Sequence, residues 1–251
     1  MRILLLGTGG YHPSERRHTA CLLLPELGIL LDAGTATFRV MPALPGRTLD
    51  VFLSHAHLDH VVGLTYLLAP LALGELEAVR VHAAPETLDA VRTHLFSQPL
   101  FPVLPPFDFR PLDASPVQLA SGAAVAWRRL DNHPGGSIAY RVDAPDDDGG
   151  MRRIAYVTDT TVDGSYADFV QGVNLLIHEC YFPDDEHGWA SKTGHSHTRP
   201  VLELARDAGV RRLLLTHVDP RNANADPAEL SRFPGVFADV AIAEDGMDVQ
   251  I

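Results

Sequence analysis

Four side chains that commonly bind metals occupy six consecutive positions near residue 55. They are His55, His57, Asp59 and His60, in the stretch SHAHLDH. One ion cannot take all four from so short a loop. Alternate positions of an extended segment point to the same side, so His55 and His57 are expected to share one ion. Asp59 and His60 would then turn toward a second ion. A solvated polar loop, or a helix start capped by Asp59, is the alternative interpretation.

Further candidate ligands follow apolar runs later in the chain. Two ions side by side need more donors than one loop provides, including an anion shared between them. His133 stands in LDNHPGG, Asp159 in YVTDT and His217 in LLTHVDP. Each of these residues alone is more commonly a turn residue, but together with the histidine cluster they predict a binuclear site. Imidazole and carboxylate donors without thiolate suit Zn²⁺ or Mn²⁺, and Fe is a third option.

Strands and helices that could position these residues are predicted along the whole chain. Apolar runs bounded by turn residues predict strands over 2–7, 20–26, 28–34, 49–55, 79–84, 123–133, 137–144, 152–160, 173–182, 211–220, 240–246 and 247–251. Helical patterns cover 61–73, 85–96 and 198–209. The proline-rich stretch 97–111 is expected to be an irregular connection or edge segment, and APDDDGG (144–150) an acidic hairpin loop. Grouped strands with helices between them indicate two packed sheets with outer helices.

Length and composition are those of a globular protein. The 251 residues suffice for one large α/β domain or two small ones. Without a repeat or a linker, we expect one domain over 1–251. Cys21 and Cys180 lie in apolar surroundings, which predicts free thiols and a reducing compartment, the cytoplasm. The N-terminal apolar run is too short for a secretory signal, and no stretch is long enough to cross a bilayer.

The segments SHAHLDH, NH before a strand, TDT and LTH resemble, in this order, the metallo-β-lactamase superfamily of binuclear hydrolases. The resemblance covers nearly the whole chain. It implies the α/β (α+β) class, with an αββα sandwich of two mixed sheets and outer helices. It also implies that one ion is held by His55, His57 and His133. The other ion would be held by Asp59, His60 and His217, with Asp159 bridging the two.

Two more segments narrow the resemblance to ribonuclease Z and its small-substrate relatives. HECYF (178–182) resembles the HEATF segment of that group, and GHSH (194–197) resembles GHST. The resemblance implies that Glu179 orients His195. A carboxylate-held imidazole can donate a proton to the departing oxygen of a phosphodiester. His197 replaces the usual threonine, and His178 is expected to pack beside the site.

Hydrolysis of a phosphodiester by a hydroxide bridging two metal ions is therefore the predicted chemistry. Asp59 would accept or orient the proton of the attacking species while it also binds metal. Four basic residues near the motifs could hold a second phosphate or a ribose, although each is more commonly a surface charge: Arg17, Lys192, Arg199 and Arg221.

Charge and spacing favour a small substrate. The net charge is −12, whereas proteins that bind long nucleic acids usually present a basic face. Only 25 residues separate His133 from Asp159, which leaves no room for the long arm of the ribonuclease Z that cuts pre-tRNA. A small or cyclic nucleotide-like phosphodiester is thus the expected substrate, as in phosphoribosyl cyclic phosphodiesterase. RNA is not expected as a partner, and a homodimer is expected by analogy.

Two alternatives remain open. The first is a ribonuclease Z-type tRNA 3′ endonuclease. The second is a non-catalytic metal-binding carrier protein, which would bind metal without hydrolysing any phosphodiester.

Overall fold

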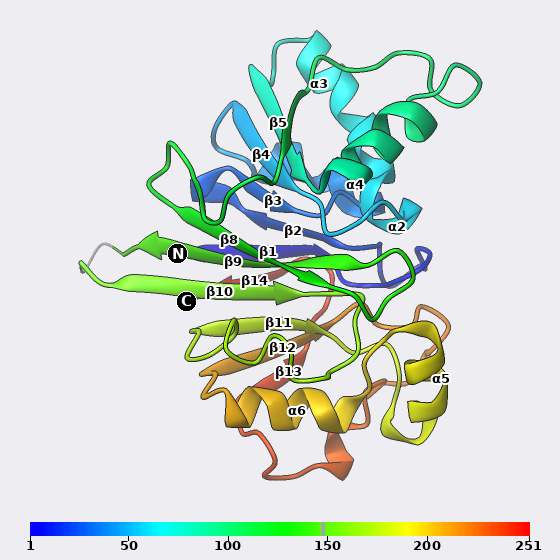
Figure 1. Ribbon diagram of the computed structural model, residues 1–251, viewed down its shortest axis with the longest axis vertical. Helices are drawn as coiled ribbons and strands as arrows, with labels where there is room; N and C mark the ends of the chain where they lie inside the picture. Colours follow the sequence, from blue (N-terminus) through cyan, green and yellow to red (C-terminus); the bar gives the residue numbers. More distant parts are fainter. Residues whose placement is uncertain (147–148) are drawn as a thin grey trace. The chain divides into compact units, whose positions relative to one another are not determined.

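A computed structural model describes residues 1–146 and 149–251. The chain divides into two compact units: residues 1–115 with 245–250 form unit 1, and residues 116–244 with 251 form unit 2. Within the described residues, each unit contains one seven-stranded mixed sheet (Figure 1). The predicted class, α/β (α+β) with two mixed sheets and helices outside them, is confirmed. That both units act as a single hydrolase domain stays a prediction.

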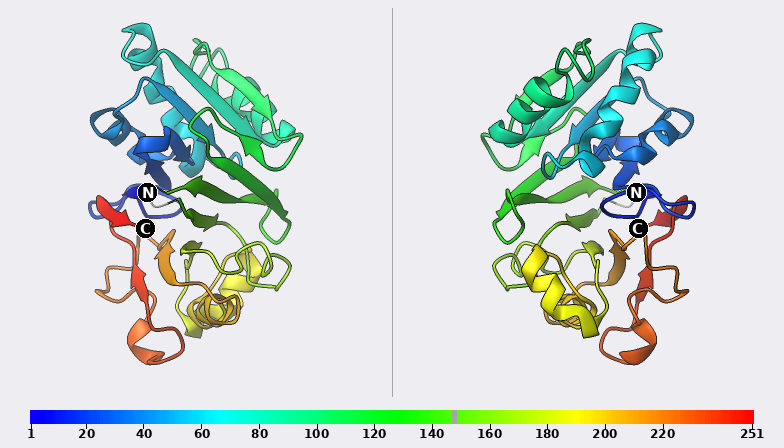
Figure 2. Two further views of the ribbon diagram at one scale, coloured as in Figure 1. Left: turned by 90° about the vertical axis from the view of Figure 1, so that its left-hand side faces the viewer. Right: turned by 90° about the vertical axis from the view of Figure 1, so that its right-hand side faces the viewer.

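The sheet of unit 1 joins the first strands of the chain to its last one. In spatial order its strands are β14 (Met247–Gln250), β1 (Arg2–Gly7), β2 (Cys21–Leu24), β3 (Ile29–Leu31), β4 (Thr48–Phe52), β5 (Ala78–Ala83) and β6 (Asp108–Pro111). From β14 to β3 the neighbours are antiparallel, and from β3 to β6 they are parallel. Strands β1 and β14 lie side by side (Figure 2). The carboxyl ends of β3 and β4 therefore share one edge.

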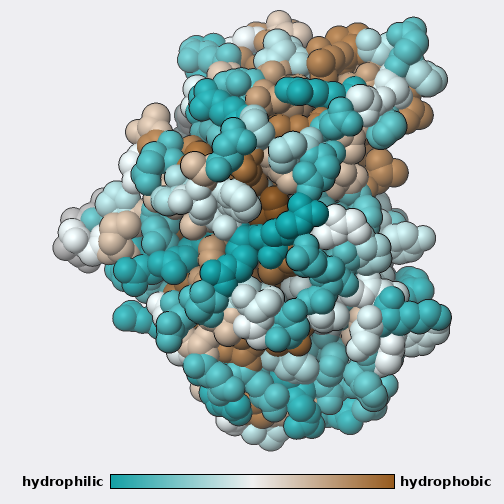
Figure 3. Space-filling view, in the orientation of Figure 1, coloured by the Kyte–Doolittle hydropathy of each residue, from teal (hydrophilic) through white to brown (hydrophobic). Residues whose placement is uncertain are grey.

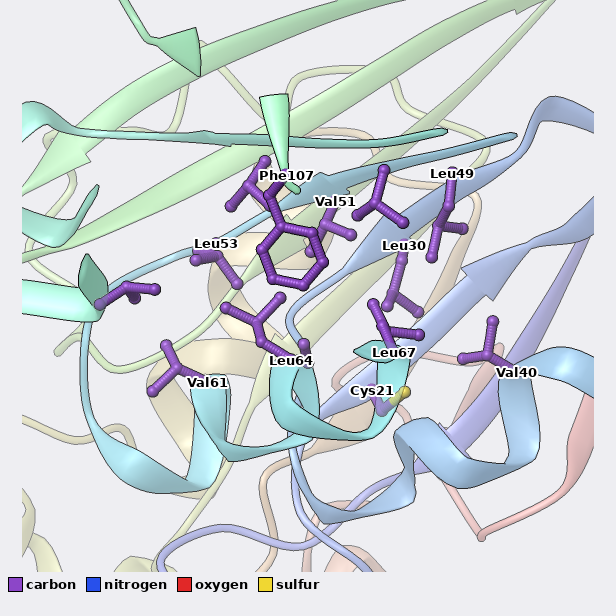
Figure 4. Packing of buried hydrophobic residues seen from close by; sticks show 14 of the residues in the cluster. Cys21, Leu30, Val40, Leu49, Val51, Leu53, Val61, Leu64, Leu67 and Phe107 are labelled. Carbon is purple, nitrogen blue, oxygen red and sulfur yellow. The ribbon is translucent and has the colours of Figure 1, made fainter. Parts of the chain in front are cut away.

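Short helices cover one face of this sheet. They are α1 (Val40–Ala43), α2 (Leu58–Val61), α3 (Leu68–Ala72) and α4 (Pro85–Ala90). A 3-10 helix, Val62–Leu67, joins α2 to α3, so the helix predicted over 61–73 is helical but divided. Leu64 and Leu67 from this segment pack over Leu30 and Val51 of the sheet (Figure 4). A Cβ on Gly63 would lie 2.2 Å from the Thr37 hydroxyl oxygen, which explains a glycine inside this segment.

The sheet of unit 2 also has one parallel half and one antiparallel half. Its strands, in spatial order, are β13 (Val240–Ile242), β12 (Arg212–Thr216), β11 (Leu175–Glu179), β10 (Met151–Val157), β9 (Ser137–Pro145), β8 (Ala124–Leu130) and β7 (Val117–Gln118). Strands β10 to β13 are parallel, and β7 to β10 are antiparallel. As a result, the ends of β8, β10, β11 and β12 and the start of β9 share one edge.

Two helices of unit 2 matter for the site. Along the chain, helix α5 (His187–Thr193) follows β11 and precedes α6 (Thr198–Asp207). Four apolar residues of α6 pack into the core against β10, β11 and β12: Val201, Leu202, Leu204 and Ala205. Gly209, in the left-handed region at φ 64°, follows the helix as the sequence predicts.

Other predictions from the sequence can be compared with the structure. Cys21 and Cys180 are free and buried, as predicted. No helix in the described part of the chain is long and apolar enough to cross a membrane. The stretch 97–111 is irregular until the edge strand β6, and Leu100, Val103 and Leu104 within it are exposed. Figure 3 shows hydrophobic surface at its upper right. The predicted acidic loop includes Asp147 and Asp148, which lie outside the described residues.

Candidate functional site

Unit 1 brings the four residues of the opening cluster together. Strand β4 ends at Phe52, and its continuation carries His55 to the edge of the sheet before α2 begins. The rings of His55 and His57 have centroids 4.4 Å apart, and those of His55 and His60 lie 4.3 Å apart. Asp59 Oδ2 lies 3.3 Å from His60 Nε2. His55 and His60 are buried, whereas His57 is exposed.

Asp32 supports this cluster from the end of β3, a role that the sequence analysis did not assign. Its carboxylate accepts hydrogen bonds from the backbone NH and the hydroxyl of Ser54, at 2.7 and 2.8 Å. His60 Nδ1 lies 2.8 Å from Asp32 Oδ2, and both side chains are fully buried. Such a carboxylate fixes the imidazole tautomer and leaves Nε2 for a metal ion. The signal in the sequence is an aspartate directly after an apolar strand, because a buried carboxylate needs partners.

Unit 2 brings the ends of three strands together around Asp159. Its Oδ1 lies 3.7 Å from His133 Nε2, and its Oδ2 lies 3.5 Å from His217 Nε2. The hydroxyl of Thr158 donates to Asp159 Oδ2 at 2.5 Å. Asp159 and His217 both follow parallel strands with positive φ, 51° and 54°. This conformation is costly for residues other than glycine, and such strain clusters at functional sites.

Glu179 and His195 form the pair that the sequence predicts. His195 Nδ1 lies 3.1 Å from Glu179 Oε1 and 3.9 Å from Asp159 Oδ1. The Glu179 carboxylate is fully buried and accepts backbone hydrogen bonds from Thr160 at 2.7 Å and Ser196 at 3.1 Å. Three donors thus hold the carboxylate, and it holds the imidazole. His195 therefore faces this carboxylate with Nδ1.

Tyr181 is a further residue that the sequence analysis missed. Its ring stacks on His195 with centroids 5.0 Å apart and an interplanar angle of 21°. Burial and the nearby charge of Asp219 raise the pKa of Tyr181 above its usual value, so the hydroxyl stays protonated. An aromatic residue shortly after the glutamate of HECYF is a weak signal, because core strands commonly contain such residues.

The structure places the remaining candidates outside this constellation. The side chain of His178 lies in the core, where its Nε2 bonds to the Tyr166 hydroxyl at 2.8 Å. Burial lowers the pKa of His178, which keeps it neutral. His197 Nδ1 bonds to Asp184 at 2.9 Å. The three arginines each have a protein partner: Arg17 donates to Thr8, Arg199 to Asp184 and Arg221 to Asp219.

The donor set fits a divalent metal ion. In unit 2, one ligand atom each from His133, Asp159 and His195 lie within 4.8 Å of one another, and so do those of Glu179, His195 and His217. In unit 1, Asp32 orients His60 while Asp59 lies beside Nε2. Buried and half-buried imidazoles and carboxylates at this spacing are the ligand types of Zn²⁺ and related ions.

Comparisons with known proteins agree with this fold. The family model described as Beta-lactamase superfamily domain matches residues 28–218. Ribonuclease Z of Gemmatimonas aurantiaca is 29% identical over 302 aligned residues, covering 99% of this chain and 95% of the relative. Ribonuclease Z of Methanosarcina mazei is 26% identical, covering 100% and 98%.

Solved structures show the same fold. The metallo-β-lactamase fold protein YhfI from Bacillus subtilis superposes with a TM-score of 0.81 at 20% identity, covering 99% of each chain. Human tRNase Z, short form, superposes with a TM-score of 0.74 at 22% identity, covering 100% of this chain and 99% of that one.

The expectation that RNA is not a partner is wrong, since relatives matched over nearly their whole length are named ribonuclease Z. A net charge of −12 does not exclude RNA, because it is a sum over the whole chain, whereas binding depends on the local field at a site. The family model, the fold and the clustered histidines and acids lead to one conclusion. The chain belongs to the metallo-β-lactamase superfamily and is a hydrolase of that fold.

Proposed function

We propose that the protein is a phosphodiesterase that uses two divalent metal ions, Zn²⁺ or Mn²⁺, with Fe as a third option. One ion would be held by His55, His57 and His133. The other would be held by Asp59, His60 and His217, with Asp159 shared between them. This assignment is what the resemblance to the metallo-β-lactamase superfamily implies for the matching residues.

The observation that carries the proposal is the Glu179–His195 pair beside Asp159. A proton donor held by a buried carboxylate is needed where a poor leaving group departs. His195 Nδ1 is 3.1 Å from Glu179 Oε1, and only about 4 Å separates it from Asp159 Oδ1. Glu179 stabilises the protonated ring, and Nε2–H donates to the departing oxygen.

The proposed reaction also needs a proton acceptor for the attacking water, and we assign this role to Asp59. Two divalent cations, when bound, neutralise the phosphate and lower the pKa of the attacking water. Asp59 would accept a proton from that water, and the backbone NH of Tyr11, 2.8 Å from Oδ2, holds its carboxylate in place. Its half-buried position keeps it accessible to water. Acid and base thus come from different segments of the chain.

Two substrate classes have specific support. The short connection between His133 and Asp159, filled by β9 and β10, supports a small or cyclic nucleotide-like diester. The names of the curated relatives support RNA, with cleavage at the 3′ end of a pre-tRNA as the second candidate activity. About 50 positions of the 302-position alignment have no residue of this 251-residue chain. The relative therefore has segments that this chain lacks.

Turnover of bis(p-nitrophenyl) phosphate with added Mn²⁺ or Zn²⁺ tests the proposed phosphodiesterase. The wild type should hydrolyse it, and Asp59→Ala should lower kcat by about 10²–10⁴-fold. Asp113→Ala removes an exposed carboxylate elsewhere in unit 1 and should leave turnover unchanged. Cleavage of a pre-tRNA in parallel distinguishes the two substrate classes. A metal-loaded protein inert to both substrates would contradict the proposal and favour the carrier alternative.

A further inference from the structure

Helix α5 presents an exposed tryptophan beside the chain's single lysine. Trp189 is 56% exposed, and Lys192 Nζ lies 4.7 Å from the centroid of its ring. All other basic residues apart from histidine are arginines. A pocket of about 560 Å³ adjoins this pair and is lined by Asp185, Glu186, His187, Gly188, Trp189 and Lys192.

Packing does not account for Trp189. A tryptophan side chain can bury roughly 150–250 Å² of surface, and leaving more than half of it exposed gives up much of that stabilisation. Ala190, fully buried, is the residue with which α5 contacts the core. The helix is therefore anchored without the indole, which is available to a ligand.

The pair is firmly connected to the candidate proton donor. Helix α5 ends at Thr193, and Gly194, with a φ of 75°, turns the chain into His195. The backbone NH of His195 donates to Ala190 O at 2.9 Å, and the hydroxyl of Thr193 donates to Trp189 O at 2.8 Å. A ligand on the indole would therefore lie within about two helical turns of His195 along the chain.

Lys192 can accept an anionic partner. Among residues 1–146 and 149–251, no carboxylate oxygen lies within 4.0 Å of its Nζ, and two of the nearby acids have other partners. Asp185 pairs with Arg232 at 2.9 Å, and the hydrogen bond from Arg232 lowers the pKa of Asp185. Asp184 pairs with His197 at 2.9 Å. Glu186 is the one acid lining this pocket that is left to oppose an anion.

We propose that Trp189 and Lys192 bind one nucleotide next to the scissile bond, with its base stacked on the indole and its phosphate at the ammonium group. The inference rests on the proposed phosphodiesterase function and names a binding element for its substrate. Stacking tolerates any base, because every base has a π face, and Lys192 supplies a point charge for one phosphate. The nucleotide could belong to an RNA strand or be a free nucleotide diester.

Binding of a fluorescein-labelled RNA hexamer, followed by fluorescence anisotropy on the metal-loaded protein, tests the stacking. Trp189→Ala should raise the Kd by about 5- to 100-fold, while Trp189→Phe should retain most of the affinity. An abasic hexamer has no base to stack, so its Kd should be the same for all three proteins. Competition by AMP separates the two sources: displacement at similar concentrations indicates a single nucleotide, and displacement only by RNA indicates a strand.

Salt dependence tests the role of Lys192. Lys192→Gln should reduce the slope of log Kd against log salt by about 0.7, the value for one phosphate contact on a single strand. Arg211→Gln is the matched control, because it removes an exposed cation elsewhere in unit 2 and should leave the slope unchanged. Unchanged RNA affinity in Trp189→Ala, with normal turnover of bis(p-nitrophenyl) phosphate, would overturn this inference alone. Absence of turnover in the wild type would instead overturn the proposed function.

Discussion

At the scale of single residues, the same device occurs in both units: a buried carboxylate that holds an imidazole. Asp32 holds His60 at 2.8 Å, and Glu179 holds His195 at 3.1 Å. Each carboxylate is itself held by backbone NH groups, at Ser54 in one case and at Thr160 and Ser196 in the other. The expected consequences differ, because His60 is a proposed ligand and His195 a proposed proton donor.

Replacing Asp32 by asparagine should weaken metal binding. The amide keeps the shape of the side chain but loses the charge that fixes the His60 tautomer. We expect about a 10- to 100-fold loss of affinity for Zn²⁺ or Mn²⁺, measured by competition with a chelator. Asp248→Asn, an exposed change on β14, should bind metal as the wild type does. Equal affinities in the two variants would exclude this role for Asp32.

Replacing Glu179 by glutamine should slow the reaction in a way that depends on the leaving group. Without the carboxylate, His195 is a weaker proton donor, so kcat for a diester with an alkoxide leaving group should fall by about 10²–10⁴-fold. p-Nitrophenolate needs little protonation, and its release should be affected far less. His195→Ala should give the same pattern, and the double variant should be no slower than either single one. Equal losses for both leaving groups would argue for a purely structural role.

At the scale of elements, the sequence predicts most strands because buried strands leave apolar runs bounded by turn residues. Strands β4, β5, β9 and β10 lie where those runs stand. The pairing of β14 with β1 cannot be read from the sequence, since it joins the two ends of the chain and depends on no local pattern. Likewise, the support of His60 by Asp32 bridges two parallel strands and becomes visible only once β3 and β4 are adjacent.

Gly188, the second residue of α5, and Gly194, just after its end, allow a matched comparison of two glycine-to-alanine variants. A Cβ on Gly194 would lie 2.4 Å from Asn132 O and 2.7 Å from His133 Cα, whereas a Cβ on Gly188 would meet nothing within 4 Å. Gly194→Ala should therefore displace both the segment that carries His133 and the segment that carries His195. We expect a loss of about 1–3 kcal/mol in the free energy of unfolding and at least about a 10-fold loss of kcat.

Gly188→Ala is the control for this change. It should leave kcat for bis(p-nitrophenyl) phosphate unaltered and stabilise the fold by up to about 1 kcal/mol, because alanine loses less backbone entropy in a helix. Urea unfolding and steady-state kinetics on both variants measure the difference. Similar behaviour of the two alanine variants would mean that the contact of Gly194 with the 132–133 segment does not position the site.

At the scale of the whole molecule, the predicted site residues are divided between the two units. His55, His57, Asp59 and His60 belong to unit 1, whereas His133, Asp159, Glu179, His195 and His217 belong to unit 2. The sequence predicts these residues because their types and order are those of a family, although the residues between them are not alike. The net charge of −12 gave no indication of relatives named ribonuclease Z, because this sum includes surface acids far from any site.

Removal of metal should lower the free energy of unfolding. An ion that binds only the folded state at 100 times its Kd adds about 2.7 kcal/mol to the free energy of unfolding, and a chelator should abolish this gain. If the second ion takes Asp59, His60 and His217 as proposed, then His60→Ala and His217→Ala should each lose most of the metal-induced gain. His12→Ala, at an exposed position, should retain it. Thermal unfolding with and without metal gives this difference for each variant. A full gain in His60→Ala beside a lost gain in His217→Ala would contradict the proposed ligand set.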